Sequence, residues 1–572
     1  MTAPPRGAGK KHCGSAAPGT NKESDPMRTS VSIDPVAARS ARISGRVATT
    51  RAAPPVEIAK LVSGALLFAV LLSATADLTA AAQQQPAGAD VVSAARRYRQ
   101  ANEHRILGEL LELLRIPNVA ADRTNIRRNA EWLLRALRAR DMEARLIETE
   151  GSPYVLGELT VPGATRTLLF YCHYDGQPAD PTRWVGHQPW QPVFRDGRLE
   201  DGAEIIPVPS GPIDPEWRIY ARSASDDRAP IIMLLAALDA LRDSGLGPTS
   251  NIKFLFEGDE EAGSPHMNEV AERYREELAA DVVFFADGPK HPSGRPTLNF
   301  GARGITTVQL TVYGPTQPLH SGHYGNWAPN PAMRLAQLLA SMKDPDTSRV
   351  RVEGWYDDRQ PLTETELAAI ERIPDDPAQS PRALGFARPE GEWARRVEAI
   401  TYPSLNVRGL RSAWTGGDTR TIVPDTAIAE LDLRLVLDIR PDRQVERLIA
   451  HIASQGFHLV EEDPDPETRA RYPLLAKVTR GEFGYPAART SMDLPVSRAV
   501  IERLREAFGV EPVAMPTTGG SVPLYAFTET LGVPTISVPT VNHDNNQHSP
   551  NENLKIDNLW RGIEILAVLL TL

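Results

Sequence analysis

The chain has only two cysteines, Cys13 and Cys172, among its 572 residues. Two thiols exclude both a disulfide framework and a zinc site built from thiolates. Positive charge is also scarce, since 73 acidic side chains outnumber 63 basic ones and give a net charge of −10. This balance argues against bulk nucleic-acid binding. Because thiolate ligands are excluded, any metal chemistry must use histidine and carboxylate ligands.

The rest of the composition is that of a globular protein. Hydrophobic residues make up 41% of the chain and charged residues 24%, which is enough to build a core. The 49 prolines and 41 glycines are scattered, so neither collagen nor a low-complexity polymer fits. The length exceeds one ordinary domain of about 100–200 residues.

The first 86 residues differ from the remainder. Residues 1–60 carry ten basic and four acidic side chains, a net charge of +6, which leaves −16 for the rest. A short apolar run at 61–76 follows, and then small residues and glutamines. This order is typical of a secretory signal, and the run is shorter than the about 20 residues of a membrane span. We predict an export leader over 1–86.

Two alternatives concern this leader. The apolar run could be an uncleaved N-terminal anchor, which would be the protein's only contact with a membrane, and translation could begin at Met27. In either case we expect an extracytoplasmic location, periplasmic or secreted, for the working part of the chain.

From about residue 90 helical and strand patterns alternate. Continuous apolar runs at 167–172, 251–256 and 281–285 predict buried strands, and a helical pattern separates the first two. Such strands are typical of an α/β sheet covered on both faces. We predict a split catalytic domain, with a mostly parallel sheet flanked by helices, over 90–300 and 488–572.

The pattern changes near Gly301. Residues 306–313 and 426–437 alternate in polarity as half-exposed strands do. The stretch 344–400 is rich in proline, aspartate and arginine and is predicted to be mostly loop. We predict an inserted α+β domain over 301–487.

Histidines and carboxylates gather where the predicted strands end or a helix begins. The carboxyl ends of strands in an α/β sheet are where chemistry gathers. Each short pattern alone is typical of a solvated turn or a helix cap. Together they would set mutually repelling carboxylates along one edge, and one or two divalent cations would relieve that repulsion. Such a ligand set suits zinc or manganese in a hydrolytic site. The residues are His173, Asp175, Asp226, Glu260, Glu261, Asp287 and His548.

In order and spacing these motifs resemble those of the dinuclear zinc metallopeptidases that include carnosinase, aminoacylase and succinyl-diaminopimelate desuccinylase. The resemblance extends from about residue 95 to 572. It is greatest for the carnosinase-like dipeptidase branch, whose further motifs match residues 406–410, 421–424 and 434–436. It implies two divalent metal ions, with zinc preferred over manganese or cobalt.

The resemblance also implies a role for each metal ligand. His173 would bind one metal ion and His548 the other. Asp226 would bridge the two ions. Glu261 would complete one site and Asp287 the other.

Two further carboxylates receive roles in the same way. Glu260 would be the general base, and Asp175 would lie behind His173 and fix its orientation. Relatives with aspartate at the position of Asp287 resemble di- and tripeptidases or aminopeptidases, whereas those with glutamate resemble deacylases and carboxypeptidases.

The inserted domain resembles the family's dimerisation or lid domain. His320 matches a histidine that reaches the partner subunit's active site and stabilises the oxyanion. Arg434 matches the residue that binds the substrate carboxylate, and Thr421 and Ser521 are placed with it in substrate binding. Without the resemblance, His320 is a helix cap, Arg434 a solvent-facing strand residue and 518–521 a tight turn.

The predicted function is that of an exported dinuclear zinc hydrolase, a homodimer through the inserted domain, that cleaves the amide bonds of dipeptides or short peptides. An N-acyl-amino-acid amidohydrolase is the first alternative, and a catalytically silent binding protein of the same fold is the second. No nucleic-acid partner is expected.

Overall fold

The computed structural model describes residues 85–572, except 377 and 378 and the side chains of 482 and 483. The predicted leader, 1–86, lies outside the described residues apart from its last two. Among the residues described, no helix is both long enough and apolar enough to cross a membrane.

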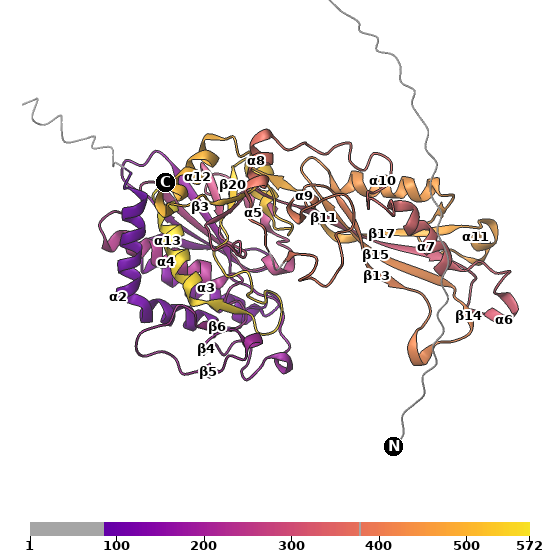
Figure 1. The fold of residues 1–572 in the computed structure, drawn as a ribbon, viewed down its shortest axis with the longest axis horizontal. Coiled ribbons are helices and arrows are strands. Elements are labelled where there is room, and N and C mark those ends of the chain that lie inside the picture. The colour runs from indigo at the N-terminus through magenta and orange to yellow at the C-terminus, as the bar shows by residue number, and fades with distance from the viewer. Residues whose placement is uncertain (1–84, 377–378) are drawn as a thin grey trace, which may run out of the picture. The chain divides into compact units, whose positions relative to one another are not determined.

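An eight-stranded sheet forms the centre of the predicted catalytic domain (Figure 1). Its strand order is β1-β2-β7-β3-β8-β20-β9-β19. The four strands β7, β3, β8 and β20 run parallel to one another, while β1, β2 and β7 pair antiparallel at one edge. The strands are β1 (Glu143–Ile147), β2 (Tyr154–Leu159), β3 (Thr167–His173), β7 (Asn251–Glu257), β8 (Val282–Phe285), β9 (Thr297–Asn299), β19 (Val513–Met515) and β20 (Thr535–Ser537).

Strand β3 shows why a continuous apolar run forms a central strand of this sheet. Phe170 and Cys172 belong to the core on one face of the sheet, and Leu169 and Tyr171 to the core on the other. Because successive side chains point to opposite faces, only an unbroken apolar sequence fills both cores. Helices α2, α3, α4, α12 and α13 cover the first face and α5 the second. They are α2 (Gly88–Leu114), α3 (Arg123–Arg138), α4 (Arg228–Asp243), α5 (Met267–Arg273), α12 (Pro495–Phe508) and α13 (Ile556–Leu570).

A second, five-stranded sheet has the order β13-β15-β11-β17-β16. Side chains of β15 alternate between buried and half-buried along its whole length. Helices α7 and α10 pack on the buried face through Leu335, Leu338, Leu448 and Ile452. The elements are β11 (Gly304–Tyr313), β13 (Ser404–Arg411), β15 (Thr426–Leu435), β16 (His458–Leu459), β17 (Leu475–Tyr485), α7 (Pro331–Met342) and α10 (Pro441–Ser454).

Three smaller sheets complete the described fold. One has the order β21-β6-β4-β5, a second pairs β10 with β18, and a third pairs β12 with β14. The predicted fold class, a split α/β domain with an inserted α+β domain, is confirmed, whereas the domain limits stay a prediction. The remaining elements are β4 (Val193–Arg195), β5 (Ile205–Ile206), β6 (Arg218–Tyr220), β10 (Gly301–Ala302), β12 (Leu319–His320), β14 (Ile422–Val423), β18 (Ala488–Arg489), β21 (Asn553–Lys555), α6 (Ser321–Tyr324) and α11 (Pro466–Arg471).

The prediction that 344–400 is mostly loop is confirmed for the described residues, although the stretch also holds two short helices that the sequence did not predict. This stretch contains helices α8 (Glu364–Arg372) and α9 (Arg396–Ala399). Thr363 and Glu366 form a reciprocal capping box at the start of α8, which satisfies two backbone N–H groups that lack helical partners. Burial of Ala369 and Ile370 adds the packing that a short helix needs.

Candidate metal centre

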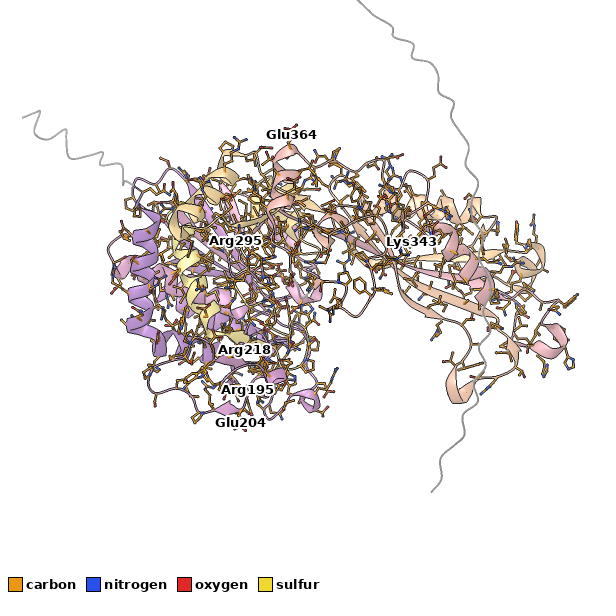
Figure 2. The ribbon with its side chains drawn as sticks, viewed as in Figure 1. Arg195, Glu204, Arg218, Arg295, Lys343 and Glu364 are labelled. Atoms are coloured by element: carbon orange, nitrogen blue, oxygen red, sulfur yellow. The ribbon has the colours of Figure 1, made fainter. Side chains whose placement is uncertain are left out.

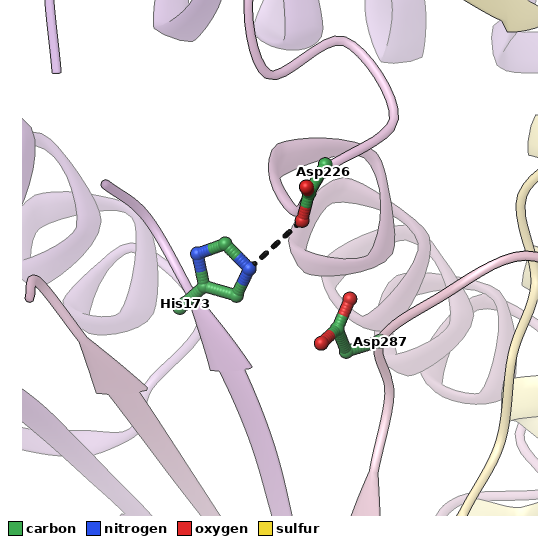
Figure 3. Close-up of side chains that lie close together, drawn as sticks. All are labelled: His173, Asp226 and Asp287. Carbon is green, nitrogen blue, oxygen red and sulfur yellow. Dashed lines mark hydrogen bonds and ion pairs between the residues drawn. The ribbon is translucent and has the colours of Figure 1, made fainter. Parts of the chain in front are cut away.

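Three predicted ligands meet where parallel strands end. His173 is the last residue of β3, Asp287 follows β8, and Asp226 lies just before α4. Figure 3 shows the three side chains facing one another. Nε2 of His173 lies 3.0 Å from Oδ1 of Asp226, and ligand atoms of all three residues lie within 4.8 Å of one another. Together they could hold one metal ion.

A second ligand group shares Asp226. Its other oxygen, Oδ2, lies 3.0 Å from Nε2 of His548, and that nitrogen lies 3.2 Å from Oε2 of Glu261. Asp226, Glu261 and His548 again offer ligand atoms within 4.8 Å of one another. The five predicted metal ligands thus form two groups joined by one carboxylate.

The donor set fits divalent cations. Oδ1 of Asp287 is buried and accepts no hydrogen bond from any described residue, although a buried acceptor is normally paired. The side chains of His173 and Asp226 are only 1% and 3% exposed, so water cannot readily solvate this charge. Histidine nitrogens and carboxylate oxygens without thiolates suit zinc or manganese.

The pKa values reflect crowded negative charge. Burial, reinforced by the charge of Asp226, raises the pKa of Glu261 to about 8 and that of Asp287 to about 6. Burial would also raise the pKa of Asp226, but its contacts with His173 and His548 hold it below the usual value. The contact with Asp226 raises the pKa of His548 to about 9. A bound cation would favour the ionised carboxylates.

Asp175 connects the first histidine to the adjacent acidic turn. Its buried carboxylate lies 3.3 Å from Nδ1 of His173 and accepts hydrogen bonds from the backbone N–H groups of Glu260 and Glu261 at 3.2 and 3.0 Å. The turn continues as a short 3₁₀ helix and ends at Gly263, whose φ of +93° favours glycine. This sharp turn lets two adjacent glutamates point in different directions.

The carboxyl group of Glu260 belongs to neither ligand group. Burial raises its pKa well above the usual value, the charge of His173 opposes this rise, and that of Asp287 adds to it. Glu260 therefore lies within electrostatic reach of both.

Two of the predicted substrate-binding residues contact each other. Nη1 of Arg434, on β15, donates a hydrogen bond to Oγ of Ser521 at 2.8 Å. Burial raises the pKa of Tyr485. The charge of Glu260 raises this pKa further, and the charge of Arg434 lowers it. The hydrogen bond thus joins the predicted inserted domain to the second part of the predicted catalytic domain, and Tyr485 lies within electrostatic reach of both Arg434 and Glu260.

His320 and Thr421 lie elsewhere in the inserted domain. His320 is the last residue of β12 and pairs with Ile422 of β14. Thr421 directly precedes β14, and its carbonyl oxygen accepts a hydrogen bond from the N–H of Ser321. Nδ1 of the exposed His320 accepts from the N–H of Gly322 and caps α6. Within the described ranges, no hydrogen bond or ion pair joins His320 or Thr421 to the metal ligands.

Sequence reasoning missed supporting residues around the site. Gln177 donates a hydrogen bond to Oε2 of Glu261 at 2.9 Å, and Asp227 accepts one from the N–H of His173 at 3.2 Å. Their positions beside Asp175 and Asp226 were the only available signal, because side-chain direction in a turn cannot be read from sequence spacing.

Comparison with known proteins identifies the family of the chain. Residues 169–572 match the profile of Peptidase family M20/M25/M40. The chain is 26% identical over 421 residues to a Cys-Gly metallodipeptidase of Schizosaccharomyces pombe, covering 72% of this chain and 81% of that protein. It is 27% identical over 377 residues to the human Beta-Ala-His dipeptidase, covering 65% and 68%.

A solved structure extends the agreement to the fold. The M20 family metallo-carboxypeptidase Sso-CP2 from Sulfolobus solfataricus is 31% identical, with a TM-score of 0.67 over 82% of this chain and 98% of that one. The resemblance drawn from the motifs is therefore confirmed. The chain belongs to Peptidase family M20/M25/M40 and is a metal-dependent peptidase.

Proposed function

We propose that this protein is a dinuclear metallodipeptidase. His173, Asp226 and Asp287 would hold one divalent ion, and Asp226, Glu261 and His548 the other, with zinc as the preferred metal and manganese or cobalt as alternatives. The observation that carries the proposal is the Asp226 carboxylate, which has one histidine nitrogen 3.0 Å from each of its oxygens. A carboxylate so placed is suited to bridge two cations.

Divalent cations in such a site supply Lewis acidity, which activates water and polarises a carbonyl. Glu260 would act as general base: its carboxylate would accept a proton from the attacking water and donate it to the leaving nitrogen. Asp175 would orient the imidazole of His173 and, through two backbone N–H groups, the turn that carries Glu260. The chain's own residues thus account for each proton transfer.

The substrate's carboxylate would bind Arg434, whose planar guanidinium suits two-pronged recognition. Ser521 supports this role because it holds Nη1 of Arg434. His320 and Thr421 would act on the substrate from the partner subunit of a homodimer, since no hydrogen bond or ion pair among the described residues joins them to the metal ligands of their own chain.

Dipeptides are the substrate class we favour. Two relatives of 26% and 27% identity are dipeptidases by name. A carboxypeptidase acting on longer peptides is the second candidate, favoured by the 31% identity to Sso-CP2.

A substrate panel on the zinc-loaded protein tests this proposal. It would contain Cys-Gly, β-Ala-His, a tripeptide, a longer peptide with a free carboxyl end, and N-acyl amino acids. We expect the dipeptides to give the highest kcat/KM. Preferred release of one residue from the longer peptide would support the second candidate, and preferred cleavage of N-acyl amino acids would identify a deacylase.

We also propose a homodimer through the inserted domain. Its outer strand β13 lies at the edge of the five-stranded sheet and exposes Val407 and Leu410, while Trp327 and Met333 are also exposed. Exposed apolar side chains and an open sheet edge each favour association with another chain.

Export is the remaining proposal. It is supported by the +6 charge of residues 1–60 and the short apolar run behind them. Mass spectrometry of the protein recovered from each cell fraction tests it. We expect an extracytoplasmic chain whose first residue falls between 74 and 90, whereas an uncut chain in the membrane fraction would indicate the anchor and an uncut chain in the cytoplasm would contradict export.

A further inference from the structure

The loop that carries His548 is held by a second, buried carboxylate. Glu552 lies four residues after His548, immediately before β21, and is fully buried. Its backbone is fixed because the N–H of Ala221 donates to its carbonyl oxygen and because β21 pairs with β6. The carboxylate therefore points from the His548 loop into the segment that leads to Asp226.

Within the described part of the chain, every hydrogen bond to this carboxylate comes from residues 222–226. Oε2 accepts from Nη1 of Arg222 at 2.8 Å and from the N–H of Ser223 at 2.9 Å. Oε1 accepts from the N–H and hydroxyl groups of Ser225 at 3.1 and 2.9 Å, and from the N–H of Asp226 at 3.0 Å. Only one of the five donors is a charged side chain, so the arrangement is more than an ion pair.

The His548 loop needs such support. His548 has a φ of +60°, and Asn546 and Asn551 have φ values of +55° and +62°, which residues with side chains adopt rarely and at a cost. Arg218, labelled in Figure 2, also ties down this loop: its guanidinium contacts Asp544 before His548 and Asn553 after it, at 2.7 and 2.8 Å.

We propose that Glu552 is a positioning residue for the metal centre, which holds the Asp226 segment against the His548 loop and so sets the spacing of these two ligands. The inference rests on the proposed dinuclear site. Glu552 contacts a ligand only through the backbone N–H of Asp226, so it would act on the geometry of the ligands and not on the substrate.

Metal titration of the whole protein tests this. In Glu552→Gln an amide NH₂ group replaces one of the two carboxylate oxygens. Each oxygen accepts at least two of the five hydrogen bonds, so at least two donors would face an NH₂ group that cannot accept them. We expect the affinity for at least one of the two metal ions to fall about 10–100-fold, as is typical when a partner behind a ligand is lost. Competition with a zinc chelator and the visible absorption of the cobalt-loaded protein measure this without an activity assay.

Glu564→Gln is the matched control. Glu564 is also a buried carboxylate, and it accepts two hydrogen bonds from Arg96, at 2.9 and 3.0 Å. Among the described residues, no hydrogen bond or ion pair joins it to the Asp226 segment or to the His548 loop. We expect normal metal affinity in this variant. Equal loss of affinity in both variants, or normal affinity in Glu552→Gln, would overturn the inference.

Two further measurements keep the result unambiguous. If Glu552→Gln does not fold, Ser225→Ala removes only the hydroxyl donor, and about 3-fold weaker metal binding is expected; unchanged affinity there would also overturn the inference. The wild-type protein is titrated in parallel. Fewer than two metal ions in the wild type would contradict the proposed function itself.

Discussion

Among the proposed ligands, Asp226 alone belongs to both ligand groups. Asp226→Asn keeps the side chain's size but removes its charge, so we expect it to lose both metal ions. Asp287→Asn changes a residue of one group only and should retain about one ion per chain. Metal analysis after dialysis against a weak chelator measures the two contents. Two ions retained in Asp226→Asn, or none in Asp287→Asn, would contradict the shared-carboxylate arrangement.

Glu260 gives a second prediction at the residue scale. Because its carboxylate lies outside both ligand groups, Glu260→Gln should keep two metal ions while kcat falls about 10²–10⁴-fold, the usual contribution of a positioned general base. Glu261→Gln, one residue away, should lose metal as well as activity. The assay pairs steady-state kinetics with metal analysis, and near-normal turnover in Glu260→Gln would exclude it as the base.

At the scale of elements, Gly301 of β10 lies in close contact with the backbone of neighbouring segments. A Cβ there would collide with the carbonyl oxygen of Ala488 and lie 3.0 Å from that of Pro516. Backbone atoms in paired strands cannot easily move, so Gly301→Ala should lower the free energy of unfolding by about 1–3 kcal/mol.

Gly108 in α2 is the control for this change, because a Cβ there meets nothing within 4 Å. Gly108→Ala should raise the free energy of unfolding by about 0.5–1 kcal/mol, since alanine is the better helix former. Denaturant titration followed by circular dichroism compares both variants with the wild type. Equal stability of the two variants would show that β10 is not closely packed.

The helices and strands also show which parts of the fold and of the site could be predicted from the sequence. Strands β3, β7 and β8 were predictable because burial on both faces demands continuous apolar runs, and their ends then located His173, Glu260 and Asp287. Helix α8 was missed because its capping box and two buried side chains are weak signals within a proline-rich stretch. Glu552 was missed because four of its five donors are backbone N–H groups or a serine hydroxyl, which no residue pattern reveals.

At the scale of the whole molecule, the proposed active site needs two chains. His320 is exposed, and no hydrogen bond or ion pair to the metal ligands involves it in the described part of its own chain. If His320 serves the partner's site, then His320→Ala and Glu260→Gln damage different halves of one composite site. Each variant alone should therefore be nearly inactive as a homodimer.

Mixing the two variants distinguishes action within a chain from action across the dimer. After exchange of equal amounts, half of the dimers are hybrids, and each hybrid pairs one intact Glu260 with the partner's intact His320. The mixture should thus recover about a quarter of the wild-type kcat per site. Light scattering establishes the dimer, and the assay is repeated after unfolding and refolding the mixture to ensure exchange. If His320 acts within its own chain, both sites of a hybrid carry one defect, and no activity returns although hybrids form.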